Sequence, residues 1–359
     1  MLWIWIGFVV FVLLLLALDL GVFHRKAHVV SMREAVGWSA VWIALGLSFA
    51  LFVYHGYENQ WLGLGTTPDA VDRSPERPEG RLNDGRTAVT KYLTGYVVEK
   101  SLSVDNVFVI AMIFGFLAVP SVYQHRVLFW GILGALVMRG LMIAVGAKLI
   151  AEFSWVLYLF GAFLILTAVK MLLIKETSDP NQTWVVRLTR RVFPVTDRFH
   201  GEHFVVRAGS AASREAETAG AAVAEDPAVT RARPGALMLT PLALALIMVE
   251  TTDVIFAVDS IPAIFAITAD PFLVFTSNVF AILGLRSLYF ALAGAIEAFR
   301  YLKLSLALVL AVVGVKMLAH RWLKEMLGPD FNLYLLLVVL GILAAGVIAS
   351  RLRGSRAAA

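Results

Sequence analysis

The fold is decided by two similar stretches, EKSLSVDNVFVI (99–110) and DVIFAVDSIPAI (253–264). Each places an acid, five residues, an aspartate and a small polar residue inside a long apolar segment. An ionised carboxylate in hydrocarbon costs at least a few kcal/mol, so such acids are rare unless they line a site or a pathway. Their recurrence predicts one functional centre built from both stretches.

The composition indicates an all-α polytopic membrane protein. Mean hydropathy is +0.78, with 59% hydrophobic and 16% charged residues. An apolar run of about 20 residues spans the hydrocarbon as a helix. The sequence predicts nine transmembrane helices, near 2–23, 37–56, 95–118, 127–148, 154–174, 237–260, 273–294, 303–322 and 331–350.

The distribution of basic residues predicts the orientation, because cytoplasmic loops are enriched in Lys and Arg. With the N-terminus outside, the cytoplasmic segments hold 18 basic residues and the outer segments hold 8. Nine spans then leave the C-terminus in the cytoplasm. The opening MLWIWIGFVV (1–10) lacks the positive region of a signal peptide, so we expect a retained first span.

The spans divide the chain into six segments. They are two N-terminal helices (1–56), a mobile extracytoplasmic loop (57–94), a first three-helix repeat (95–174), a cytoplasmic loop (175–236) with a disordered part at 208–234, a second three-helix repeat (237–322), and a last helix with a basic tail (323–359). The composition of 208–234, which is rich in Ala and Glu and poor in large apolar residues, predicts the disorder.

Matching residues in the same order support the internal repeat. Glu99 aligns with Asp253 and Asp105 with Asp259, and then Arg139 aligns with Arg286. The tetrapeptide VKML also occurs twice, at 169–172 and 315–318. Two tandem three-span units must insert in opposite senses, which is the inverted-repeat plan of many secondary transporters. Chance similarity between apolar segments is the competing explanation.

Helix geometry leaves two arrangements of the acids open. Residues six apart lie about 120° from one another around a helix, so Glu99 and Asp105 do not share a face. Either both faces are used, or the helix is interrupted between the acids. Pro262 favours interruption in the second repeat, because its ring disturbs the carbonyl of Val258.

The two acid-bearing stretches offer carboxylate, amide, hydroxyl and carbonyl oxygens as ligands. Such oxygens suit a hard divalent cation such as Mn²⁺, Mg²⁺ or Ca²⁺ and would repel an oxyanion. We expect Asp105, Asp253 and Asp259 to be direct ligands, and Glu99 and Glu250 to be ligands or proton carriers. Further expectations are a neutral oxygen from Asn106, a weaker one from Ser260, and Asp19 on the cytoplasmic side of the route. A thioether from Met248 or Met112 would tilt selectivity toward Mn²⁺, although simple packing is the better explanation of each methionine.

Simpler interpretations accompany each of these signals. The acids could only pair with Lys100, Arg139, Lys170, Arg286 or Lys316 to hold helices together, and we assign the two arginines to balancing buried charge. The pairs His200/His203 and His24/His28 are more typical of solvated or basic segments than of metal sites. With no cysteine, thiol chemistry and disulfides are excluded. No GxGD signature of an intramembrane aspartyl protease occurs, so we do not expect an enzyme.

These stretches resemble the TerC family of integral membrane proteins, which includes Alx-type manganese exporters. The matching segments are LALDLGVFHRKAH (16–28), EKSLSVDNVFV (99–109) and VETTDVIFAVDSIPAIFAIT (249–268). The resemblance implies a bacterial inner-membrane protein associated with tellurium resistance and Mn²⁺ efflux. It also implies that the functional acids are Asp19, Glu99, Asp105, Asp253 and Asp259, with Asn106 beside them.

Together these observations predict export of a divalent cation, most simply Mn²⁺, in exchange for protons. The expected partners are the metal and the lipid bilayer, with no nucleic acid and no resident cofactor; the sequence leaves the oligomeric state open. The alternative function is a membrane scaffold that organises a tellurite or metal stress-response complex. We expect Asp105→Ala or Asp259→Ala to abolish metal resistance without changing membrane abundance.

Overall fold

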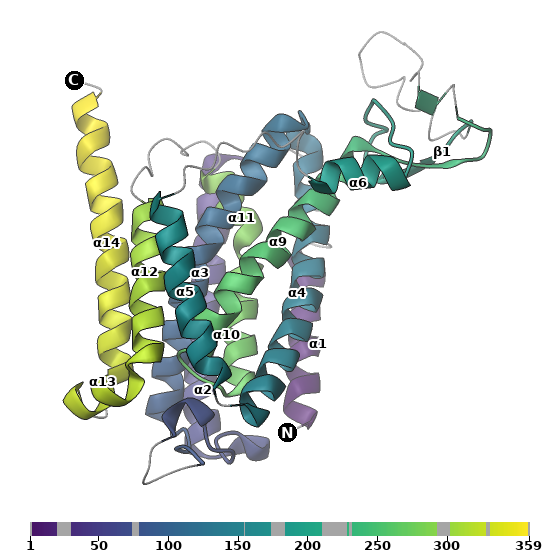
Figure 1. Cartoon of the computed structure of the whole chain (residues 1–359). Coiled ribbons are helices and arrows are strands. Elements are labelled where there is room, and N and C mark those ends of the chain that lie inside the picture. Colours follow the sequence, from purple (N-terminus) through teal and green to yellow (C-terminus); the bar gives the residue numbers. More distant parts are fainter. Residues whose placement is uncertain are drawn as a thin grey trace.

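The computed structural model describes residues 2–19, 30–73, 79–153, 155–173, 184–209, 228–229, 232–292, 302–327 and 331–357. Helices form most of this part of the chain (Figure 1). The first half contains α1 (Leu2–Leu18), α2 (Met32–Glu58), α3 (Gly85–Phe116), α4 (Ser121–Glu152), α5 (Val156–Leu173) and α6 (Trp184–Val192). The second half contains α9 (Pro241–Phe265), α10 (Pro271–Leu283), α11 (Leu285–Leu292), α12 (Leu302–Leu318), α13 (His320–Leu327) and α14 (Phe331–Ala357).

The all-α membrane class expected from the sequence is confirmed. Five helices are long and apolar enough to cross a membrane, namely α2, α4, α5, α9 and the 332–350 part of α14. The bent pair α10–α11 is a sixth, and α1 and α12 are shorter apolar helices. The charged helix α3 has 32 residues, or about 48 Å at 1.5 Å per residue. Each of the nine expected spans therefore falls on one of these helices or on the bent pair.

Short polar side chains fix where the long helices begin. Thr240 accepts a hydrogen bond from the amide of Ala243 at the start of α9, and Asp84 accepts one from Thr87 at the start of α3. Such N-caps satisfy amide groups that have no partner within the helix. As a result α3 begins at Gly85, ten residues before the expected start of its span at 95. Helix α9 begins at Pro241, four residues after the expected start of its span at 237.

The two three-helix units pack as an inverted pair. Helices α3 and α9 run antiparallel, since Asn106 bonds to Asp253 while Gly95 lies beside Ile264 further along both helices. Helix α4 packs against α9, and α10 packs in the same way against α3. Each unit therefore covers the first helix of the other with its own second helix.

The third helices of the two units, α5 and α12, cross at close range (Figure 1). Gly161 on α5 lies against Met317, and Gly314 on α12 lies against Leu164, which again gives an antiparallel pair. A Cβ on Gly314 would lie 2.9 Å from the carbonyl oxygen of Gly161. Small residues at this crossing let the two backbones approach, as is common between membrane helices.

The helix break lies in a different place from the one suggested by Pro262. Helix α9 continues through Pro262, so an interruption between Asp253 and Asp259 is wrong and both faces of the helix are used. A proline in a membrane helix is tolerated where neighbouring groups satisfy the freed backbone. The bend occurs at Gly284, where α10 and α11 meet at 41°.

The segment between α5 and α9 folds partly on its own. It contributes α6 and a two-stranded antiparallel sheet of β1 (Val205–Arg207) and β2 (Leu237–Leu239). Arg126 at the start of α4 bonds to Glu202 at 2.6 Å and covers the ring of Phe204. Glu202, which lies between His200 and His203 in the sequence, therefore pairs with an arginine. Most of the expected disordered segment 208–234, and His24 and His28, lie outside the described residues.

Candidate cation site

The guanidinium of Arg139, on α4, is buried among oxygen atoms from α3, α9 and α10. Its Nη2 and Nε atoms donate to the two carboxylate oxygens of Asp253, at 2.9 and 3.2 Å. Its Nη1 atom donates to the carboxylate of Glu99, to Oδ1 of Asn278 at 2.9 Å and to Oγ of Ser260 at 3.3 Å. The Glu99 side chain is fully buried, and that of Arg139 is 3% exposed. We call Glu99, Arg139, Asp253, Ser260 and Asn278, with Asn106, the central cluster.

A seven-residue spacing on two antiparallel helices brings this cluster together. Glu99 and Asn106 on α3, and Asp253 and Ser260 on α9, are seven apart, which is within about 20° of two full turns. The Nδ2 atom of Asn106 donates to Asp253 at 3.0 Å, while Glu99 and Ser260 both accept from Arg139. Each acid of one repeat therefore faces a neutral polar residue of the other.

Three polar atoms of the central cluster are buried without a hydrogen-bond partner. They are Oε2 of Glu99, Oδ1 of Asn106 and Nδ2 of Asn278. A buried polar atom left unsatisfied costs about 1–3 kcal/mol. Two of the three are acceptors, and two carboxylates share one guanidinium. This arrangement is suited to receiving a further cation.

Glu250 adds a third carboxylate, beside the two of the cluster. It lies three residues before Asp253 on α9 and is partly buried. Its carboxylate packs directly on the backbone of α4, because a Cβ at Gly134 would lie 1.9 Å from Oε1. In the described part of the chain no hydrogen bond or ion pair engages Glu250. Its carboxylate is therefore available next to Asp253, toward the start of α9.

The other expected aspartate ligands lie on different faces. Asp259 accepts a hydrogen bond from Thr167 of α5 at 3.1 Å, whereas Asp253 faces α4. Asp105 directly precedes Asn106 and is partly buried. No three carboxylate or imidazole side chains converge as a metal-binding group within the described ranges. The single cage of Asp105, Asp253 and Asp259 is thus not formed in this structure, because residues six apart on a helix diverge by about 120°.

Asp19 belongs to a separate ion pair. It follows the last residue of α1 and accepts a hydrogen bond from Nη2 of Arg286 at 2.8 Å. Both side chains are largely buried, at 10% and 7% exposure. Arg286 lies in α11, two residues after the bend at Gly284. The two aligned arginines therefore balance different acids, Arg139 in the central cluster and Arg286 at Asp19.

Two lysines, the partly buried Lys100 and the buried Lys316, hold backbone carbonyls. The Nζ atom of Lys100 donates to the carbonyl oxygen of Ala281 at 3.0 Å, beside the bend between α10 and α11. The Nζ atom of Lys316 donates to the carbonyl oxygen of Ala266, directly after α9. A helix end or bend leaves carbonyl groups without helical partners, and these ammonium groups satisfy them. The lysines stabilise helix ends at the edges of the two repeats.

Sequence reasoning missed Asn278, which completes the oxygen shell around Arg139. It ends a run of three polar residues, Thr276, Ser277 and Asn278, inside an apolar span. Thr276 and Ser277 donate to carbonyls of their own helix, whereas Asn278 reaches across to α4. The run of three polar residues in an apolar span could have identified Asn278. An amide side chain that makes no hydrogen bond within its own helix needs a partner on another helix.

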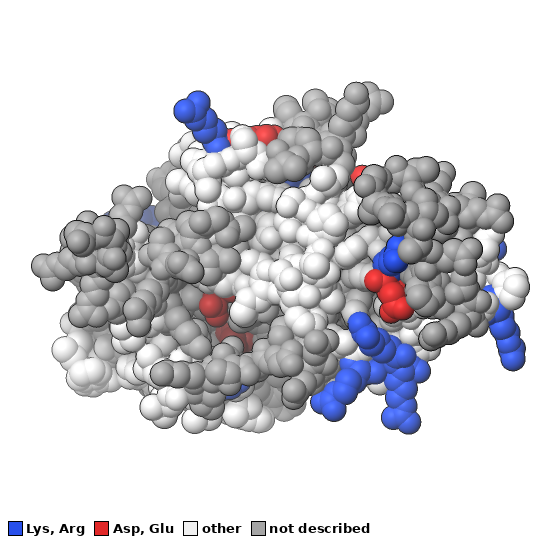
Figure 2. Space-filling view, turned by 90° about the horizontal axis from the view of Figure 1, so that it is seen from above, with Lys and Arg blue, Asp and Glu red and all other residues white. Residues whose placement is uncertain are grey.

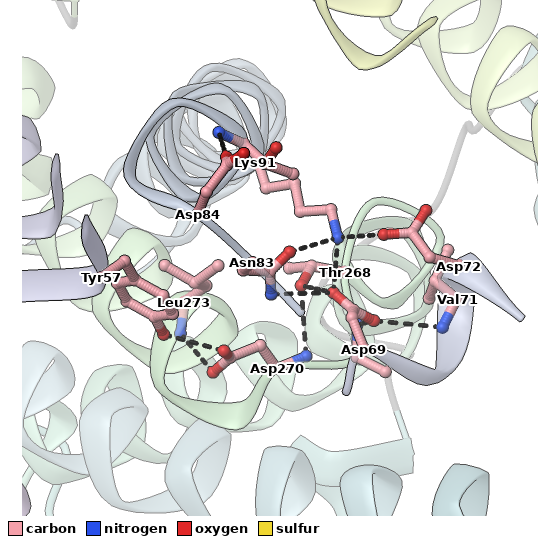
Figure 3. A network of polar contacts seen from close by, with 12 residues as sticks. Tyr57, Asp69, Val71, Asp72, Asn83, Asp84, Lys91, Thr268, Asp270 and Leu273 are labelled. Carbon is pink, nitrogen blue, oxygen red and sulfur yellow. Dashed lines mark hydrogen bonds and ion pairs between the residues drawn. The ribbon is translucent and has the colours of Figure 1, made fainter. Parts of the chain in front are cut away.

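A second buried network ties the segment before α3 to the end of α9 (Figure 3). The ammonium of Lys91 donates to Asp69 at 2.8 Å, to Asp72 at 2.6 Å and to Oδ1 of Asn83 at 2.7 Å. Asp69 also accepts from the hydroxyl of Thr268, and from the amide of the next residue at 2.8 Å. These contacts fix the described part of a loop that the sequence suggested was mobile.

The environment of Asp69 favours its ionised form. Burial alone would raise the pKa of this carboxyl, but attraction to Lys91 and hydrogen bonds from Lys91, Thr268 and Ala269 lower the pKa to about 2. The opposite holds for Asp270, the N-cap of α10, since burial and the charge of Asp69 raise its pKa. Asp270 also accepts a hydrogen bond from the hydroxyl of Tyr57 at 2.8 Å. The network thus joins α2, α3, α9 and α10 at one end of the bundle.

Comparisons with known proteins agree with this architecture. Residues 84–358 match the model of the family described as "Integral membrane protein TerC family". An uncharacterized membrane protein of Myxococcus xanthus is 44% identical over 355 residues, covering 99% of this chain and 93% of that protein. A candidate membrane-bound redox modulator, Alx, of Escherichia coli K12 is 43% identical over 344 residues, covering 94% and 93%. An uncharacterized membrane protein of Rickettsia bellii is 35% identical, covering 95% and 96%. No solved structure matches the chain.

Proposed function

Because this chain belongs to the TerC family of integral membrane proteins, we propose that it exports a divalent metal cation, with Mn²⁺ the preferred substrate. The observation that carries the proposal is the central cluster, where Glu99 and Asp253 face one guanidinium inside the bundle. Two acceptors of that cluster, Oε2 of Glu99 and Oδ1 of Asn106, are buried without a donor. Acids this deep in membrane helices are characteristic of ion pathways.

The donor atoms favour a hard cation. The cluster offers carboxylate, amide and hydroxyl oxygens, and the chain contains no cysteine. Such ligands suit Mn²⁺, Mg²⁺ and Ca²⁺ rather than soft metals, and they would repel a tellurium oxyanion. Met112 is 59% exposed on α3, so its thioether is unsuited to a buried site. Met248 is buried one and a half turns before Asp253 and is the thioether nearest in sequence.

In this proposal Arg139 is a built-in counter-cation. With no metal bound, its guanidinium compensates Glu99 and Asp253, which lowers the cost of keeping two carboxylates inside the membrane. A divalent cation that displaces the guanidinium neutralises both carboxylates and gains the oxygens of Ser260 and Asn278. Protons that bind the carboxylates as the metal leaves, before the guanidinium returns to them, would supply the exchange that drives export.

The proposed orientation places the N-terminus outside and the C-terminus in the cytoplasm of the bacterial inner membrane, following the excess of basic residues in the cytoplasmic loops. Helix α9 then begins at the cytoplasmic face. Glu250 lies on the cytoplasmic side of Asp253, where it would receive the metal first. Asp19 and its partner Arg286 lie near the same face, beside the route.

A transport assay with purified protein tests this proposal. Proteoliposomes with an imposed pH gradient are supplied with Mn²⁺, Mg²⁺ or Ca²⁺, and metal movement is followed with an entrapped indicator. We expect Mn²⁺ transport that responds to the gradient and falls at least tenfold in Glu99→Gln and in Asp253→Asn. Matched controls are Glu152→Gln and Asp197→Asn, which alter exposed acids of the same type.

A wild-type protein that folds and inserts but moves none of the three cations would overturn the proposal. That result would favour the alternative of a membrane scaffold, for which the α6 and β1–β2 region offers a surface outside the bundle. Transport that both cluster variants retain would leave export in place but reject the central cluster as its site.

A further inference from the structure

Helix α6 is a short amphipathic helix that the proposed transport route does not use. Its sequence, WVVRLTRRV, contains three arginines among apolar residues. It lies at the edge of the bundle, beside the end where α9 begins, at a steep angle to the membrane-spanning helices (Figure 1). A helix in this position has the direction expected of one that lies along a membrane surface.

One face of α6 packs on the protein. Val186 and Thr189, three apart, are 3% and 8% exposed, and the helix contacts α9. Val186 belongs to the main hydrophobic core of the bundle. Because α9 enters the bundle directly after Thr240, this packing holds α6 next to the start of a membrane-spanning helix.

An adjoining side of α6 exposes apolar side chains. Leu188 and Val192 are 50% and 58% exposed and lie four apart, on one stripe of the helix. Phe193, the next residue, is 51% exposed. Nothing in the described part of the chain covers this stripe.

A basic stripe runs beside the apolar one. Arg187 and Arg191 are also four apart, about 100° around the helix from Leu188 and Val192, and Arg190 extends the stripe. Arg190 and Arg191 are exposed, and neither has an ion-pair partner among the described residues. Figure 2 shows a group of basic side chains projecting at the edge of this end of the molecule.

We propose that α6 is an interfacial anchor that binds anionic phospholipids. Its apolar stripe enters the boundary between headgroups and acyl chains, and Arg190 and Arg191 bind the lipid phosphates. Helices with a basic face and an adjoining face of Leu, Val or Phe adopt this position on membranes. An acidic protein partner would match the arginines, but the apolar stripe and the adjacent membrane-spanning helix favour lipid. The inference is independent of which ion the central cluster carries.

The absence of cysteine makes the test direct, because a single introduced cysteine takes a spin label without competition. Full-length Leu188→Cys and Val192→Cys are labelled in nanodiscs of phosphatidylcholine alone or mixed with phosphatidylglycerol. Power saturation with oxygen and with a water-soluble nickel complex reports the depth of each label. Val205→Cys is the control, since Val205 is similarly exposed, at 47%, on β1 of the same region.

We expect labels at 188 and 192 to favour oxygen over nickel, with a stronger preference when phosphatidylglycerol is present, while the label at 205 favours nickel. Arg190→Gln with Arg191→Gln should remove the dependence on phosphatidylglycerol, because each basic residue contributes about fivefold to binding an anionic surface. Labels at 188 and 192 that are as open to nickel as the label at 205 would overturn the proposal. So would labels hidden from both reagents, which would indicate a protein partner.

Discussion

The substitution Asp69→Asn isolates the buried network that closes one end of the bundle. Asparagine keeps the size of the side chain but places an amide NH₂ where one carboxylate oxygen receives the ammonium of Lys91 and the hydroxyl of Thr268. Lys91 then keeps only one carboxylate, that of Asp72, in a site where its own side chain is fully buried. We therefore expect a loss of stability larger than for a surface ion pair.

Two estimates set the size of the effect. Lowering the pKa of Asp69 from 3.8 to about 2 corresponds to about 2.4 kcal/mol, since each pH unit is worth about 1.36 kcal/mol. Removing one partner of a buried ion pair typically costs about 3–5 kcal/mol. The free energy of unfolding should therefore fall by about 2–5 kcal/mol, which for a chain of this length is a drop of about 3–7 °C in melting temperature.

The assay is thermal unfolding of purified protein in detergent, followed by intrinsic tryptophan fluorescence. Arg81→Gln is the matched control, because it removes an exposed ion pair in the same loop, at 3.7 Å from Asp84. Exposed pairs contribute about 0–1 kcal/mol. A melting temperature for Asp69→Asn within the range of this control would refute the reasoning.

The pH dependence gives a second readout of the same substitution. A carboxyl whose pKa is lowered by folding stabilises the protein above its unfolded pKa, near 3.8, and loses that contribution as the pH falls through about 2. The difference in stability between the wild type and Asp69→Asn should therefore shrink as the pH is lowered from about 5 to 2. A difference that stays constant over this range would assign the effect to packing instead of charge.

Further substitutions test the helix contacts. Gly134→Ala places a methyl group against the carboxylate of Glu250 and should cost about 1–3 kcal/mol by thermal unfolding, whereas Gly37→Ala, in open space, should change stability little. Recovery of stability in Gly134→Ala combined with Glu250→Ala would show that the clash is the cause, and equal losses in both backgrounds would exclude it. Lys100→Met leaves the carbonyl of Ala281 unsatisfied at the helix bend and should cost about 1–3 kcal/mol; wild-type stability would show that the bend does not need this ammonium.

The membrane class and the repeat could be predicted from the sequence because both depend on local composition. Apolar runs of membrane length identify the spans, and matching acids identify the two units. The helix ends were predicted less accurately. Helix α3 begins at Gly85, where Asp84 caps a stretch that the composition had assigned to a loop. The Asp84 cap therefore starts α3 ten residues before the apolar segment at 95, and the hydropathy pattern does not predict this extension.

The contacts between the acids could be predicted only in part. Spacing correctly separated Glu99 from Asp105, but it could not decide which member of each pair faces the other repeat. That choice depends on the packing of α4 against α9 of the other unit, which brings Arg139 to the faces of Glu99 and Asp253. The network of Asp69 and Lys91 joins residues 22 apart and reaches to Thr268, so no local pattern reveals it.

Direct binding of Mn²⁺ to the purified protein tests the central claim, that Glu99 and Asp253 together hold the transported cation. The loss of the electron paramagnetic resonance signal of free Mn²⁺ gives the bound fraction for the wild type, Asp253→Asn and the exposed control Asp197→Asn. We predict saturable binding that weakens at least tenfold in Asp253→Asn and is unchanged in the control. Equal affinity in the wild type and Asp253→Asn would contradict the account.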